Sequence, residues 1–216
     1  MNSTQLIIIG SCVPVFVATL YAAFLYRELN RALRLFSLFL FISGTVQAVS
    51  LWMWFMGMNN LPLLHVYVAA GFTALALFYN HLLRDFIDQR LMAFLVGGFL
   101  CFTVLNSLFL QSVYTFNSYA LTAESVIVLI FSISTLMLGQ HEVTRENRRT
   151  DFASLNWINA GLLIFYTSDI LIYYFGDALI DLFPSYMNEY AWTAHAFFSA
   201  IMYSCFIIGL WKSPKN

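Results

Sequence analysis

Four ionisable side chains lie inside long apolar runs, where a charged group is costly and needs a physical reason. They are His65, Glu124, Asp169 and His195, and each belongs to a different run. A carboxylate near the middle of a membrane helix costs about 2.5–3.5 kcal/mol on insertion scales. Since neither carboxylate has a Lys or Arg at its own depth, each must pair with a histidine, take up a proton or bind a cation.

These four side chains are expected at one depth. Counted from the ends of their runs at about 1.5 Å per residue, they lie roughly 6–10 Å below the same boundary. Asn117, Tyr119 and Tyr166 are polar groups of the same layer. If the helix faces converge, the seven residues form an outward-opening pocket that binds a small molecule, a lipid or a cation.

Two histidines and two carboxylates at one level could also hold zinc or another divalent cation. In a catalytic zinc site, three of His65, Glu124, Asp169 and His195 would bind the metal with a water, and the fourth would act as general base. The sequence has no His-Glu-x-x-His motif, so this site would depend wholly on tertiary convergence. A structural role competes with both interpretations, because buried polar residues also form hydrogen bonds between helices, each of which stabilises their association by about 0.6 kcal/mol.

Seven apolar runs must position these residues. The 216-residue chain is 61% hydrophobic and only 10% charged, whereas an average soluble domain has about 25% charged residues. A spanning helix needs roughly 20 mostly apolar residues, and backbone groups in lipid must find their partners within their own segment. The predicted helices are 5–26, 35–57, 61–83, 91–111, 117–138, 154–175 and 190–211. The predicted fold is all-α, a single domain over 1–216 that forms a bundle of seven transmembrane helices.

The basic residues predict the orientation of this bundle. All ten Lys and Arg residues fall on the same side of the seven helices, and an excess of Lys and Arg marks the cytoplasmic side. The N-terminus is therefore expected outside and the C-terminus in the cytoplasm. The net charge of −1 gives no attraction to nucleic acid, so we expect membrane lipids around the chain and no nucleic-acid partner.

No cofactor is expected. A retinal Schiff base needs a lysine within the last helix, but the only lysines are Lys212 and Lys215, which lie beyond its predicted end. Metal binding stays open as the alternative given above.

Four short motifs carry a family resemblance. They read Leu64-His65-Val66-Tyr67, Phe116-Asn117-Ser118-Tyr119 followed by Glu124-Ser125, Trp157-Ile158-Asn159-Ala160-Gly161-Leu162-Leu163-Ile164-Phe165-Tyr166, and Trp192-Thr193-Ala194-His195. Over roughly 61–83 and 114–211 the chain resembles an uncharacterised family of small bacterial seven-helix membrane proteins, often found near sensor histidine kinases. The resemblance implies a bacterial cytoplasmic (inner) membrane and a signalling role, and assigns no catalytic residue.

A second, shorter likeness concerns an enzyme. Ser168-Asp169 is similar to the C-terminal half of bacterial lysoplasmalogenases, but the further acidic motifs of that family have no counterpart in the first four predicted helices. Three functions follow from the sequence. The leading hypothesis is a receptor-like sensor whose partner, a sensor kinase or another signalling protein, binds the cytoplasmic loop 139–152. The alternatives are an intramembrane lipid hydrolase, metal-dependent or acid–base, and an ion or solute carrier.

Overall fold

The computed structural model describes residues 3–143, 149–176 and 185–213, and these residues are helical with no strand. They form seven α-helices and one π-helical turn. The elements are α1 (Ser3–Leu25), α2 (Arg31–Phe55), α3 (Leu61–Leu83), α4 (Gln89–Leu105), the π-helical turn η1 (Asn106–Leu110), α5 (Ser118–Val143), α6 (Arg149–Tyr174) and α8 (Ser185–Trp211).

Each of the seven predicted runs forms a helix. Six of the described helices, α2 to α6 and α8, are long and apolar enough to cross a membrane, while α1 contributes a shorter apolar stretch, Ile9–Leu25. This architecture fits a multi-pass integral membrane protein.

The extent predicted for loop 139–152 is wrong. α5 continues to Val143 and α6 already begins at Arg149, and residues 144–148 lie outside the described part. A helix need not stop where its sequence becomes polar, because its backbone hydrogen bonds continue equally well outside lipid.

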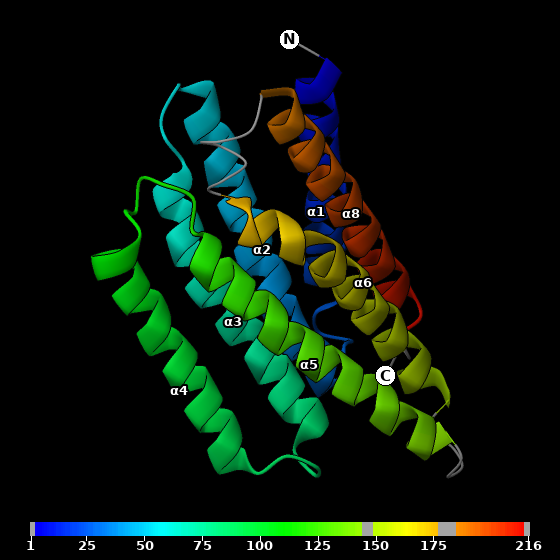
Figure 1. Cartoon of the computed structure of the whole chain (residues 1–216). Coiled ribbons are helices and arrows are strands. Elements are labelled where there is room, and N and C mark those ends of the chain that lie inside the picture. The colour runs from blue at the N-terminus through cyan, green and yellow to red at the C-terminus, as the bar shows by residue number, and fades with distance from the viewer. Residues whose placement is uncertain (1–2, 144–148, 177–184, 214–216) are drawn as a thin grey trace.

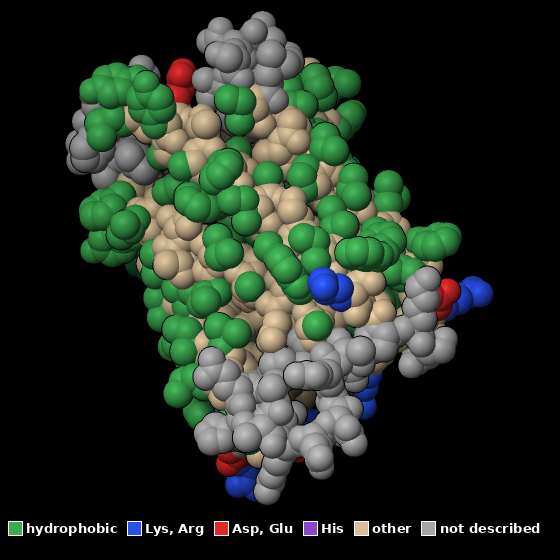
Figure 2. All heavy atoms as spheres, turned by 90° about the vertical axis from the view of Figure 1, so that its right-hand side faces the viewer, with side chains coloured by type: hydrophobic (Ala, Val, Ile, Leu, Met, Phe, Trp, Pro, Cys, Tyr) green, Lys and Arg blue, Asp and Glu red, His purple; other side chains and the backbone are tan. Residues whose placement is uncertain are grey.

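The helices run alternately up and down, so that the N-terminus lies at one end of the bundle and the C-terminus toward the other (Figure 1). α6 packs along α5 and α8, α8 along α1, and α2 along α3. α4 lies at the edge of the bundle, beside α3. Figure 2 shows a face covered mainly by hydrophobic side chains, with the Lys and Arg side chains gathered in its lower part.

Exposed Trp and Tyr side chains surround both ends of the bundle. At the end that holds the α2–α3 turn they are Trp52, Trp54, Tyr114, Tyr119, Tyr174, Tyr186 and Tyr190, and at the other end Tyr26, Trp157 and Trp211. Tyr and Trp are enriched at the two membrane–water interfaces because each has an apolar ring and a polar group. Their two bands agree with a bundle that spans a bilayer.

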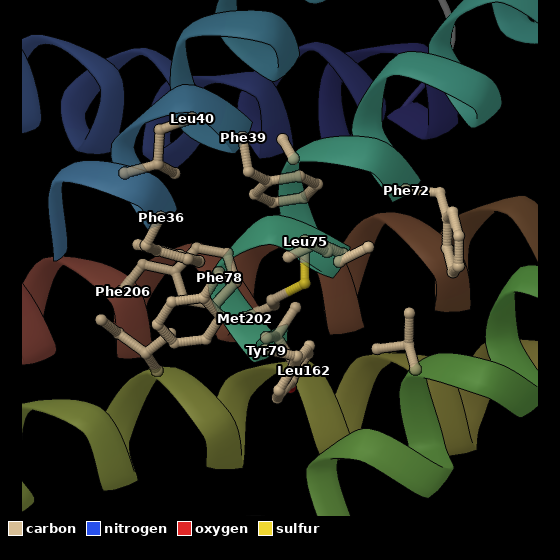
Figure 3. Packing of buried hydrophobic residues seen from close by; sticks show 14 of the residues in the cluster. Phe36, Phe39, Leu40, Phe72, Leu75, Phe78, Tyr79, Leu162, Met202 and Phe206 are labelled. Atoms are coloured by element: carbon tan, nitrogen blue, oxygen red, sulfur yellow. The ribbon is translucent and has the colours of Figure 1, made fainter. Parts of the chain in front are cut away.

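A cluster of aromatic rings closes the half of the bundle near the α1–α2 turn. Phe36 lies at its centre, with ring centroids 4.9 Å from Phe206 and 5.3 Å from Phe78. Figure 3 shows these rings from α2, α3 and α8 packed together. All three side chains are fully buried, so the open space of the molecule lies in its other half.

Two glycines allow α6 and α8 to approach closely. A Cβ on Gly161 would lie 2.9 Å from the Cβ of Cys205 and 3.0 Å from the carbonyl oxygen of Met202. A Cβ on Gly209 would lie 3.0 Å from the carbonyl oxygen of Ser154, whose hydroxyl donates to the carbonyl oxygen of Gly209 over 2.7 Å. In lipid no hydrophobic driving force brings helices together, so the small residues stabilise this contact by allowing close van der Waals packing.

A buried polar network joins α3, α5 and α6. The Tyr79 hydroxyl donates to Oδ1 of Asn159 over 2.8 Å and lies 2.7 Å from the Ser132 hydroxyl. The Asn159 amide donates in turn to the carbonyl oxygen of Ser132 over 2.9 Å.

A glycine ends α2. Gly57 has φ of 67°, and its N–H donates to the carbonyl oxygen of Trp54, while Met58 donates to that of Met53. This pair of bonds defines a Schellman motif, whose left-handed residue is normally glycine. The motif turns the chain directly into α3 at one end of the bundle.

Candidate functional site

A cavity of about 670 Å³ lies inside the bundle, in the half away from the aromatic core. Its walls come from α1, α2, α3, α5, α6 and α8, and α4 contributes none. Asn59, Asn60 and Asn188, at the α2–α3 turn and in the first turn of α8, show that it reaches one end of the molecule. The volume falls within the range of about 300–1,000 Å³ that is usual for small-molecule sites.

Glu124 lies on the cavity wall. Its position in the second turn of α5 directs it inward, and the residue is only 3% exposed. The Tyr166 hydroxyl, from α6, donates to its Oε1 over 3.1 Å. Tyr67 and Tyr173 line the same cavity, and no Lys or Arg belongs to the described lining.

His195 and Asp169 form a hydrogen-bonded pair between α8 and α6. Nδ1 of the histidine contacts Oδ2 of the fully buried carboxylate. Because a carboxylate accepts, Nδ1 carries the shared proton, and the other ring nitrogen, Nε2, is left for proton transfer or ligand contact. The His195 side chain is 29% exposed and lines the cavity.

Three aromatic rings enclose the imidazole of His195. The ring centroids of Phe165, Trp192 and Tyr173 lie 5.5, 5.6 and 6.0 Å from it. Phe116 packs edge-on against Trp192, with centroids 5.2 Å apart, and covers Gly176. The chain that enters α5 thereby closes over the histidine.

His65 takes a different position from the one expected of it. It does not line the cavity, because it points toward α4, with Nδ1 2.8 Å from the Ser107 hydroxyl and Nε2 3.2 Å from the carbonyl oxygen of Thr115. A carbonyl only accepts, so Nε2 carries a proton toward Thr115. The Ser107 hydroxyl, which also donates to the carbonyl oxygen of Thr103 over 2.9 Å, lies at Nδ1. These contacts tie η1 and the turn before α5 to α3.

Asn117 and Tyr119 also lie outside the cavity lining. Asn117 is buried and accepts from the Asn106 amide over 2.8 Å, while Tyr119 is 54% exposed on the outer face of α5. Gln111 completes this second polar cluster: its Oε1 accepts from the Tyr119 backbone and its amide donates to Ser118. These groups hold the start of α5, next to η1.

Glu124, Tyr166 and His195 thus line the cavity, Asp169 is buried and contacts His195, and His65, Asn117 and Tyr119 lie outside the lining. Among the residues that the structure describes, no three His, Cys, Asp or Glu side chains lie close enough to hold a metal ion. The four-residue metal set considered from the sequence is therefore divided between two places, with His65 beside α4.

Tyr67 and Tyr203 are cavity residues that the sequence did not single out. The Tyr67 hydroxyl lies 3.1 Å from that of Ser43. Residues two apart on a helix point about 200° apart. Tyr67 and His65 therefore lie on opposite faces of α3, Tyr67 toward the cavity and His65 away from it. A smaller recess of about 260 Å³ adjoins, lined by Ser11, Cys12 and Ala196 together with five residues of the main cavity.

Comparison of the chain with family models, with curated proteins and with solved structures gave no match. The geometry of the cavity is therefore the basis on which a function can be assigned.

Proposed function

We propose that this chain is a receptor-like membrane sensor that binds a small molecule, a lipid or a cation in the cavity between α2, α3, α5, α6 and α8. The observation that carries the proposal is the cavity of about 670 Å³, whose wall holds Glu124 and the His195 ring oriented by Asp169. Buried ionisable groups of this kind within spanning helices are usually functional.

The proposal includes the topology. The bundle spans a bacterial cytoplasmic membrane seven times, with α1 as the first span, the N-terminus outside and the C-terminus inside. In support, the turns α1–α2 and α3–α4 carry Arg27 and Arg84 at the same end of the bundle, as the positive-inside rule requires of the cytoplasmic side. The cavity then opens outward.

α6 is the element through which binding would reach the cytoplasm. It places Tyr166 at the cavity and Asp169 against His195, packs along α5 and α8, and begins at Arg149. A ligand that binds one position of α6 more tightly shifts the population toward that position. The partner, a sensor kinase or another signalling protein, would read this shift at residues 139–152.

A matched pair of variants tests the binding function. Ser199→Phe places a ring in the cavity, whereas Ser204→Phe makes the same change on the exposed face of the same helix. The purified full chain in lipid nanodiscs is screened by thermal unfolding against a collection of small molecules and lipids. We expect ligands that stabilise the wild type and Ser204→Phe but not Ser199→Phe. Hits that stabilise all three equally would refute a cavity receptor.

An acid–base lipid hydrolase is the second candidate, favoured by the His195–Asp169 pair. A histidine held by a carboxylate at one nitrogen is the arrangement of a general base. Turnover of lysolipids by the wild type, lost in His195→Gln and kept in Glu189→Gln, would establish the enzyme. Stoichiometric zinc that disappears in His195→Ala would establish its metal-dependent form.

A further inference from the structure

The charges around the cavity do not balance. Asp169 is fully buried and does not line the cavity, whereas in the described lining Glu124 is the one carboxylate and His195 the one group that can be cationic. That group is already paired with Asp169. The described lining contains no Lys or Arg, and the recorded hydrogen bond to Glu124 comes from the neutral Tyr166 hydroxyl. One carboxylate therefore faces a cavity large enough for a ligand without a positive partner from the protein.

Aromatic rings form much of the same wall. Of the 23 lining residues that the structure describes, eight are aromatic, among them Tyr67, Tyr166, Tyr173 and Trp192. The face of an aromatic ring is negative and attracts a cation, most strongly where water is excluded. Rings around one carboxylate are the arrangement that recognises ammonium groups.

A hard metal ion fits this wall poorly. Calcium takes about 6–8 oxygen ligands and magnesium requires near-octahedral oxygen geometry, whereas the cavity offers Glu124 as its one unpaired carboxylate, surrounded by rings. An organic ammonium ion needs no such ligand set. Its positive charge would lie against the Glu124 carboxylate, and its alkyl groups would pack against the aromatic rings.

We propose that the cavity binds an organic cation, an amine or quaternary ammonium group with apolar substituents, and that Glu124 is its counter-ion. This inference deepens the proposed function and rests on it. Tyr67, Tyr166 and Tyr173 surround the ammonium group, and Trp192, near the start of α8, covers the side from which the ligand enters.

The test uses two probes of the same shape, benzyltrimethylammonium and its neutral analogue neopentylbenzene. Binding to the full chain in nanodiscs is followed by thermal unfolding and by titration calorimetry. We expect the cation to stabilise the wild type and the neutral probe to bind more weakly. Glu124→Gln, which keeps an oxygen that can accept from Tyr166, should weaken binding of the cation at least about tenfold. Glu189→Gln, an exposed carboxylate on α8, should leave its affinity unchanged.

A second pair of variants keeps the test decisive if Glu124→Gln does not fold. Trp192→Leu removes one ring of the wall and should weaken binding of the cation about threefold or more. Trp211→Leu removes an exposed ring of the same helix and should leave the affinity unchanged. Equal binding of both probes, unaffected by Glu124→Gln or Trp192→Leu, would overturn the cation class and leave the sensor standing. No binding of benzyltrimethylammonium to the wild type would also overturn it. The ligand screen that compares the wild type with Ser199→Phe tests the sensor function independently of these probes.

Discussion

The contact between α6 and α8 allows a sharp prediction, because a single methyl group at Gly161 has no room. In Gly161→Ala the added carbon would lie 2.9 Å from the Cys205 Cβ and 3.0 Å from the Met202 carbonyl oxygen. Attractive carbon contacts begin at about 3.5 Å, so the helices must separate by about half an ångström. Both contacted atoms are fixed to the α8 backbone, and no rotamer change relieves the clash. Overpacking of this kind costs about 1–3 kcal/mol.

The opposing effect is the better helix propensity of alanine, about 0.5–1 kcal/mol. We therefore expect Gly161→Ala to lower the free energy of unfolding by about 1–2 kcal/mol. Gly98→Ala is the control, because a Cβ at this position of α4 meets nothing within 4 Å. It should be neutral or slightly stabilising. The measurement is reversible unfolding in mixed micelles with increasing SDS. If Gly161→Ala is as stable as Gly98→Ala, the close approach of α6 and α8 is wrong.

Three further substitutions are to be measured by the same unfolding titration. Tyr79→Phe leaves Oδ1 of the buried Asn159 without its donor and should lower the free energy of unfolding by about 1 kcal/mol. Tyr119→Phe, on the exposed face, should change it little, and equal effects of the two would contradict the buried network. Gly57→Ala must hold a Cβ at φ of 67° and should cost about 1–2 kcal/mol, and an unchanged stability would argue against the Schellman turn. Asp169→Asn converts the hydrogen bond to His195 from a charged to a neutral one and should cost about 1 kcal/mol; a gain in stability would speak against the pair.

The helices could be predicted from the sequence because lipid leaves the backbone no alternative. Any apolar run of sufficient length must satisfy its own hydrogen bonds and becomes a helix. The end of a helix outside lipid is not subject to this constraint. The extent predicted for loop 139–152 is accordingly wrong, because all of its described residues are helical.

The direction of each side chain could not be predicted in the same way. His65 and His195 are of one residue type at similar expected depth, yet one points to α4 and the other into the cavity. Helices that are apolar on all sides carry little periodic signal that tells the inner face from the outer. Depth therefore follows from counting along the chain, whereas direction depends on which helices are neighbours, and that is a tertiary property.

The edge position of α4 gives the molecule a practical asymmetry. Because no residue of α4 lines the cavity, and large side chains such as Phe94 and Leu105 face outward from it, a fluorophore attached at Cys101, whose side chain is exposed, would leave the binding walls untouched. This thiol lies near the middle of the span Gln89–Leu110 and would face lipid in the proposed bilayer, so the reagent must itself partition into lipid. Cys12 and Cys205 are buried and should react more slowly with a bulky reagent. The native chain thus already carries a labelling position, and movements of the remaining helices relative to this outer helix can be followed optically without redesigning the protein.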